Sequence, residues 1–103
     1  MPAILINEKN YKKEVKRCKT PVLLSFSACH SVSSFLLRQT ADALSDELRG
    51  RIKVGVVGSA STGLIKEFDV RFLPMTVLIR GDTVTDRIIG NPGKAGFIKI
   101  LLE

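Results

Sequence analysis

The stretch Val22-Leu-Leu-Ser-Phe-Ser-Ala-Cys-His-Ser-Val-Ser-Ser-Phe-Leu-Leu37 decides the fold. Its first residues follow Thr20-Pro21 and are almost wholly apolar, which is typical of a buried strand. After a short polar turn, an apolar stripe with helical spacing begins, made up of Leu37, Ala41, Leu44 and Leu48. The first turn of a helix that follows a buried strand offers unpaired N–H groups and the positive end of the helix dipole. We therefore expect the functional site at Ser31-Val-Ser-Ser34.

Length and composition favour a single domain over residues 1–103. The chain has 103 residues, 45% of them hydrophobic, which is enough for one packed core. Its apolar runs are too short to span a membrane, and its N-terminus lacks the features of a signal peptide. The two cysteines, at positions 18 and 29, give neither a disulfide framework nor the spacing of metal ligands. We expect a monomeric cytoplasmic protein with reduced thiols and with no metal or cofactor.

The basic residues are concentrated near the N-terminus. Residues 8–19 carry six basic side chains and two acidic ones, and so supply +4 of the net charge of +6. Periodicity predicts a helix here, with Asn7 as its cap and Tyr11, Val15 and Cys18 on its buried face. No aromatic residue is interleaved with the basic ones to stack on a base. A solvated helix face is therefore favoured over nucleic-acid binding, and neither nucleic acid nor a membrane is an expected partner.

Strands and helices alternate along the chain, and a hairpin follows near its end. This order predicts an α/β fold, with a mixed sheet that is flanked by helices on both faces. The predicted strands cover 4–6, 22–27, 51–57, 75–79 and 84–89. The predicted helices cover about 8–19, 33–48 and 94–102, with a short one that begins at Ser61 or Thr62.

The order of elements, with Pro74 just before the hairpin, resembles thioredoxin from Ile4 to Leu102. The resemblance implies a thioredoxin fold, with a central mixed sheet of about five strands flanked by four helices. It also implies a cis peptide bond before Pro74. The segments that carry the resemblance are 22–28 (the strand into the family's active site), 68–78 (its proline loop), 81–84 (its hairpin turn) and Ile89-Gly90.

The residues that carry the family's redox chemistry are replaced. Ser31 and Ser34 stand where the resemblance places the two cysteines of Cys-x-x-Cys. Disulfide exchange needs a thiolate and a second, resolving thiol, and a serine hydroxyl supplies neither. An N-cap at Ser31 and a first-turn position for Ser34 fit these residues well. The other replacements are Ser25 for a buried acid, Val56 for its lysine partner, and Ser27 and His30 for two tryptophans.

Two alternatives keep the redox chemistry. Cys29 lies just before the helix, where the dipole and a protonated His30 would lower its pKa and make it a lone reactive thiol in a thiol-disulfide oxidoreductase. An incidental exposed cysteine is the favoured interpretation, because no resolving partner is in place. The second alternative is a thioredoxin whose active-site cysteines were replaced by design. Such a change would leave the surroundings intact, and here they differ too.

The leading hypothesis is a redox-inactive domain that binds a protein or an extended peptide. In the family, the residue before the cis-proline, here Leu73, presents its backbone to an extended peptide. Phe35 is expected to be exposed because it lies opposite the apolar stripe, and Phe72 lies beside the peptide groove. An exposed apolar patch usually marks a contact surface. The predicted binding residues are Val32, Phe35, Phe72, Leu73, Pro74, Ile89 and Gly90.

Overall fold

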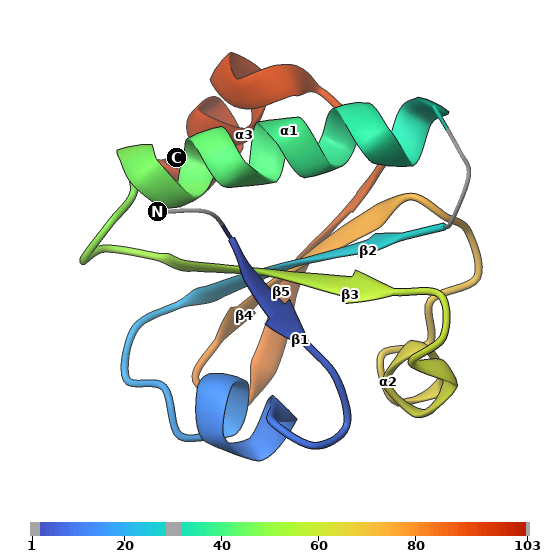
Figure 1. Ribbon diagram of the computed structural model, residues 1–103. Helices are drawn as coiled ribbons and strands as arrows, with labels where there is room; N and C mark the ends of the chain where they lie inside the picture. Colours follow the sequence, from blue (N-terminus) through green and yellow to red (C-terminus); the bar gives the residue numbers. More distant parts are fainter. Residues whose placement is uncertain (1–2, 29–31, 103) are drawn as a thin grey trace.

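Strand β2 (Val22–Ser27) lies at the centre of the sheet in the structure, a computed structural model (Figure 1). The structure describes residues 3–28 and 32–102, apart from the side chains of Ser33 and Ser34. Within this part of the chain, the sheet has five strands in the order β1-β3-β2-β4-β5. The other strands are β1 (Ile4–Ile6), β3 (Lys53–Gly58), β4 (Met75–Arg80) and β5 (Thr83–Ile89).

The pairing of the strands changes direction at β2. Strands β1, β3 and β2 run parallel to one another, whereas β4 is antiparallel to β2 and β5 is antiparallel to β4. Parallel neighbours need a crossover, and a hairpin joins antiparallel ones. The helices supply the two crossovers between parallel strands, and the turn at Gly81-Asp82 joins β4 to β5.

Helices cover both faces of the sheet. Figure 1 shows α1 (Val32–Glu47) and α3 (Gly93–Leu101) on one side, and α2 (Thr62–Glu67) with the π-helix Lys12–Lys16 on the other. The described residues thus form an α/β fold with a mixed sheet and four helices, as predicted from the sequence and consistent with a thioredoxin-like fold. No helix within them is long and apolar enough to cross a membrane.

Two apolar clusters fill the layers above and below β2. Leu23 packs with Leu37 and Phe97 beneath α1 and α3, while Leu24 and Phe26 pack in the cluster on the opposite face. Successive residues of a strand point to opposite faces, so β2 contributes to both clusters. It is buried along its length, as its continuous apolar run predicted.

The predicted helix at 8–19 is wrong in its extent. The helical segment is the π-helix Lys12–Lys16, and residues 8–10 form a turn instead. The predicted cap is confirmed, because the side chain of Asn7 accepts hydrogen bonds from the N–H groups of Lys9 and Asn10 and its carbonyl accepts one from the N–H of Tyr11. The buried face is also confirmed, because Val15 is buried and both Tyr11 and Cys18 pack against the same cluster.

Other boundaries differ by one or two residues. Strand β3 begins at Lys53 rather than at 51, because the N–H groups of Arg51 and Ile52 both donate to the carbonyl of Leu48 and extend the turn after α1. Helix α2 begins at Thr62 with Ser61 in the N-cap position, but the Ser61 side chain makes no capping hydrogen bond. The side chain of Glu8 instead accepts a hydrogen bond from the N–H of Leu64.

We expect Gly55→Ala to destabilise the sheet. A Cβ atom at Gly55 would lie 2.7 Å from Cγ1 of Ile6 and 3.0 Å from Cδ2 of Leu24. Overpacking of this kind should lower the free energy of unfolding by about 1–3 kcal/mol. Gly58→Ala is the matched control in β3, since nothing lies within 4 Å of its Cβ position. Urea unfolding followed by circular dichroism checks the comparison, and equal midpoints for the two variants would contradict the packing of β1 on β3.

Candidate functional site

Three strand ends lie level with one another at one end of the sheet. Phe26 of β2 pairs with Met75 of β4, and Met75 pairs with Ile89 of β5. Helix α1 follows β2, the loop with Pro74 precedes β4, and Gly90 follows β5. The register therefore brings the segments that carry the predicted binding residues to the same end of the sheet (Figure 1).

The loop before β4 is tied to the end of β5. The peptide bond between Leu73 and Pro74 is cis. The N–H of Gly90 donates a hydrogen bond to the carbonyl of Pro74 at 3.1 Å. Gly90 has a φ of 83°, a left-handed conformation that suits glycine. This tie fixes the backbone of the loop next to the strand that carries Ile89.

The backbone of Leu73 is open to a partner. Among the described residues, neither its N–H nor its carbonyl has a hydrogen-bond partner, and its side chain is exposed. One residue further along, Pro74 uses its carbonyl for Gly90. A backbone donor and acceptor on one open residue are what a second extended chain needs to pair with it.

Large exposed apolar side chains lie on the segments that meet at this end of the sheet. Val32 and Phe35, in the first turns of α1, are 77% and 62% exposed. Phe72 and Ile89 are 61% and 66% exposed, and Pro74 is half-buried. The exposure predicted for Phe35 from the helical stripe is confirmed. We call this set the apolar surface; its members are Val32, Phe35, Leu36, Phe72, Leu73, Pro74 and Ile89.

Leu36 belongs to the apolar surface but was missed in the sequence analysis. It is 48% exposed, whereas its neighbour Leu37 is fully buried. Two adjacent leucines lie about 100° apart around a helix, so both cannot share the inward stripe. The spacing of four residues between Val32 and Leu36 was the available signal, because it places both on one face.

Three of the singled-out residues lie outside the described part of the chain. They are Cys29, His30 and Ser31; Ser34 is in α1, but its side chain is not described. The predictions for these residues, which are a lone thiol at Cys29 and the positions of the family's cysteines at Ser31 and Ser34, therefore stay predictions.

The positions that the resemblance assigns to a buried acid and a lysine hold neither. Ser25 is buried, and its Oγ lies 3.1 Å from Oγ1 of Thr76 on β4. Val56 is buried in the apolar cluster under α1. A pair of hydroxyl groups satisfies its own hydrogen bonds but does not exchange protons at neutral pH as a carboxylate does.

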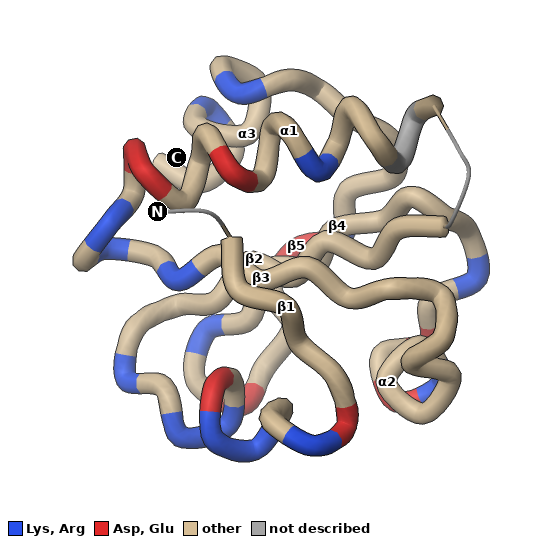
Figure 2. Tube along the Cα trace, viewed as in Figure 1, with Lys and Arg blue, Asp and Glu red and all other residues tan. Residues whose placement is uncertain are grey.

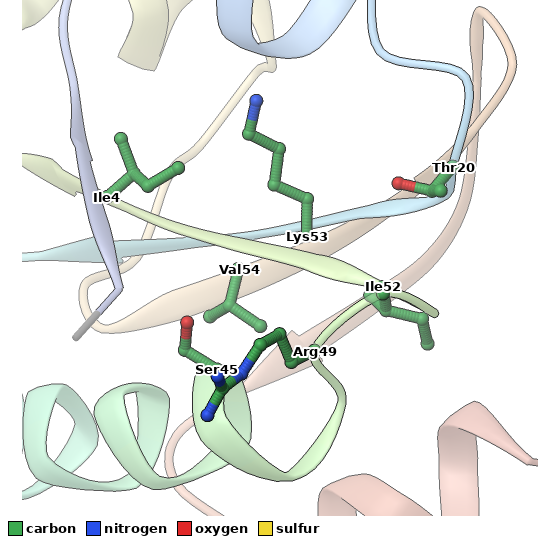
Figure 3. Close-up of a pocket in the computed structure, with 8 residues that line it drawn as sticks. Ile4, Thr20, Ser45, Arg49, Ile52, Lys53 and Val54 are labelled. Atoms are coloured by element: carbon green, nitrogen blue, oxygen red, sulfur yellow. The ribbon is translucent and has the colours of Figure 1, made fainter. Parts of the chain in front are cut away.

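Two cavities lie elsewhere on the molecule. The smaller, of about 270 Å³, lies between the end of α1 and the start of β3. Figure 3 shows Ser45 on α1 and Arg49 in the turn after it, both facing the side of β3 from which Val54 projects, whereas Lys53 projects from the opposite side. Lys53 forms an ion pair with Glu14, and the hydrogen bond between the two side chains lowers the pKa of the Glu14 carboxyl.

The larger cavity, of about 540 Å³, lies beside Tyr11 and Phe68. Burial, and then the charges of Glu67 and Asp82, raise the pKa of the Tyr11 hydroxyl. Neither cavity is lined by a residue of the apolar surface. That surface is open, which suits a macromolecular partner better than a small molecule. Across residues 3–28 and 32–102, no three side chains of His, Cys, Asp or Glu come together to hold a metal ion.

The sequence matches no protein-family model, and no curated protein is significantly similar to it. The functional interpretation therefore depends on the geometry of the chain itself.

We expect Ser25→Ala to be more damaging than the loss of the whole hydroxyl pair. The single change leaves the buried Thr76 hydroxyl without its partner, which should cost about 1–3 kcal/mol of unfolding free energy. The double change Ser25→Ala/Thr76→Val removes both polar groups and should restore much of the loss. Urea unfolding of Ser25→Ala, Thr76→Val and the double variant measures the difference. A loss of unfolding free energy in the double variant equal to the sum of the losses in the two single variants would contradict a paired role.

Proposed function

We propose that this chain is a redox-inactive, thioredoxin-like domain that binds an extended protein segment beside Pro74. The domain acts as a monomer in the cytoplasm, where its unpaired thiols stay reduced. The observation that supports this function most strongly is that the N–H and carbonyl of Leu73, a member of the apolar surface, have no hydrogen-bond partner among the described residues.

Backbone pairing and side-chain burial supply different parts of the binding. The N–H and carbonyl of Leu73 orient an extended segment alongside the loop, as in other cases of strand addition. The affinity comes mostly from burying side chains such as Phe35 and Phe72, at about 1.5–3 kcal/mol for each one that is fully covered. Exposed aromatic residues are also enriched among the residues that dominate binding at protein interfaces.

The sequence does not carry the cysteine spacing of an exchanging pair. The chain has two cysteines, Cys18 and Cys29, and ten residues separate them instead of two. Among the described residues, Cys18 lies before β2, with its Sγ 3.2 Å from Oγ1 of Thr20. Serine hydroxyls at positions 31 and 34 offer no second route to a disulfide.

Binding should depend on the aromatic members of the apolar surface. We expect Phe72→Glu and Phe35→Glu each to weaken, by at least about tenfold, the binding of peptides that are selected on this protein from a random displayed library. Leu102→Glu is the matched control, because Leu102 is 62% exposed but lies outside the apolar surface. Fluorescence anisotropy with labelled synthetic peptides measures the affinities.

The same peptides test the backbone contact. Methylation of the amide nitrogen that faces Leu73 removes a donor and should weaken binding, while methylation of its neighbour in the peptide should not. Equal affinities for wild type, Phe35→Glu and Phe72→Glu would contradict the assignment of this surface.

Redox inactivity can be measured directly. In the insulin reduction assay with dithiothreitol, we expect the protein to give the same rate as dithiothreitol alone, because the sequence has no Cys-x-x-Cys pair to supply a resolving thiol. The Cys29→Ala variant should give that rate too. Catalytic turnover that disappears in Cys29→Ala would instead support the alternative of a monothiol oxidoreductase.

A further inference from the structure

The basic residues that adjoin the apolar surface are all arginines. Arg38, Arg71 and Arg87 lie within three residues of its members, and no lysine does. The basic segment at 8–19 has the opposite composition, with five lysines and a single arginine. Arginine presents a planar fork of donors that matches a carboxylate in two parallel hydrogen bonds, which the ammonium group of lysine does not.

Each arginine comes from a different element of the apolar surface. Arg38 lies one helical turn after Phe35 on α1, on the same side of the helix. Arg71 directly precedes Phe72, and Arg87 lies two residues before Ile89, on the same side of β5. Figure 2 shows basic positions along α1 and on the loop that leads into β4.

These arginines keep donors for a partner. Within the described residues, neither Arg38 nor Arg87 forms an ion pair, and the guanidinium group of Arg87 makes one hydrogen bond, to the sulfur of Met75 at 3.9 Å. Arg71 uses its Nε for Asp69, at 3.2 Å, and both side chains are largely exposed. The terminal nitrogens of its guanidinium group therefore stay available.

Three aspartates near these arginines already make hydrogen bonds or ion pairs within the protein. The carboxylate of Asp42 accepts a hydrogen bond from the N–H of Ala3, and that of Asp86 accepts one from the hydroxyl of Thr85. Asp69 is engaged by Arg71. Each of these carboxylates keeps its negative charge, and Glu67 and Asp82 line the same cavity as Arg87, so both signs of charge lie beside the apolar surface. What the arginines offer to the flanking groups of a partner is guanidinium donors that have no carboxylate partner within the described residues.

We propose that the bound segment is an extended apolar stretch flanked by acidic residues, whose carboxylates pair with Arg38, Arg71 and Arg87. This inference rests on the proposed function, since it names the class of segment that the same surface takes. Contacts with the apolar surface set the position of the bound segment, and the arginines select the charge of the residues that flank it.

The test uses one apolar peptide core with three kinds of flank. The core comes from a library peptide whose binding depends on Phe72, and each end carries two Glu, two Gln or two Lys residues. We expect the Glu-flanked peptide to bind about fivefold or more tightly than the Gln-flanked one, since exposed ion pairs contribute modestly. The Lys-flanked peptide should bind most weakly, and the differences should shrink at high salt.

Two charge-matched double variants separate the local arginines from the net charge. Arg38→Gln/Arg87→Gln should bring the ratio of Glu-flanked to Gln-flanked affinity close to one. Lys12→Gln/Lys13→Gln removes the same charge near the opposite end of β2 and should preserve the ratio. Equal affinities for all three flanks, or equal effects of the two double variants, would overturn the inference and leave the proposed function standing. Failure to find any peptide with Phe72-dependent binding would overturn both.

Discussion

The pairing of β2 with β3 on one side and β4 on the other fixes where each loop of the candidate site emerges. Because β2 is parallel to β3 and antiparallel to β4, the carboxyl end of β2 lies next to the amino end of β4. The end of β2 and the loop that holds Pro74 are therefore neighbours. The hydrogen bond from Gly90 to Pro74 adds the end of β5 to the same place.

The apolar surface lies outside both cores, although Phe26 and Met75 at the same end of the sheet are buried. Leu37 and Leu44 on α1 are buried against the sheet, whereas Val32, Phe35 and Leu36, at the start of the same helix, lie largely open. Apolar side chains that gather on one open face without entering a core are a liability unless a partner covers them. The proposed binding function gives these residues a reason to stay exposed, and the proposed pairing of a partner with the neighbouring arginines would add selectivity.

Much of the fold could be predicted from local patterns. The limits of β1 and β2 follow from short apolar runs, and the fully buried side of α1 follows from the stripe at Leu37 and Leu44. In the basic segment, the cap at Asn7 was predicted correctly, and Asn7 and Asn10 exchange the hydrogen bonds of a capping box. The extent of the helix could not be predicted, because the bond from the N–H of Arg17 to the carbonyl of Lys12 has the spacing of a π-helix, which ends at Lys16.

The candidate site was predictable only in part, for a similar reason. Exposure of Phe35 follows from helical periodicity, but the pairing of Ser25 with Thr76 depends on the register between β2 and β4, which no local pattern contains. The engagement of Asp42 by Ala3 likewise joins positions 39 residues apart. Whether each arginine near the apolar surface has a carboxylate partner is likewise known only from the contacts of the folded chain.

The most direct test of the binding surface is a titration of ¹⁵N-labelled protein with a library-selected peptide, followed by amide chemical shifts. The account predicts that the largest shifts fall on Phe35, Leu36, Leu73 and Gly90, with the amide of Leu73 among the most affected because it gains a hydrogen bond. Shifts concentrated around the basic segment at 8–19, or around the cavity beside Arg49, would contradict it.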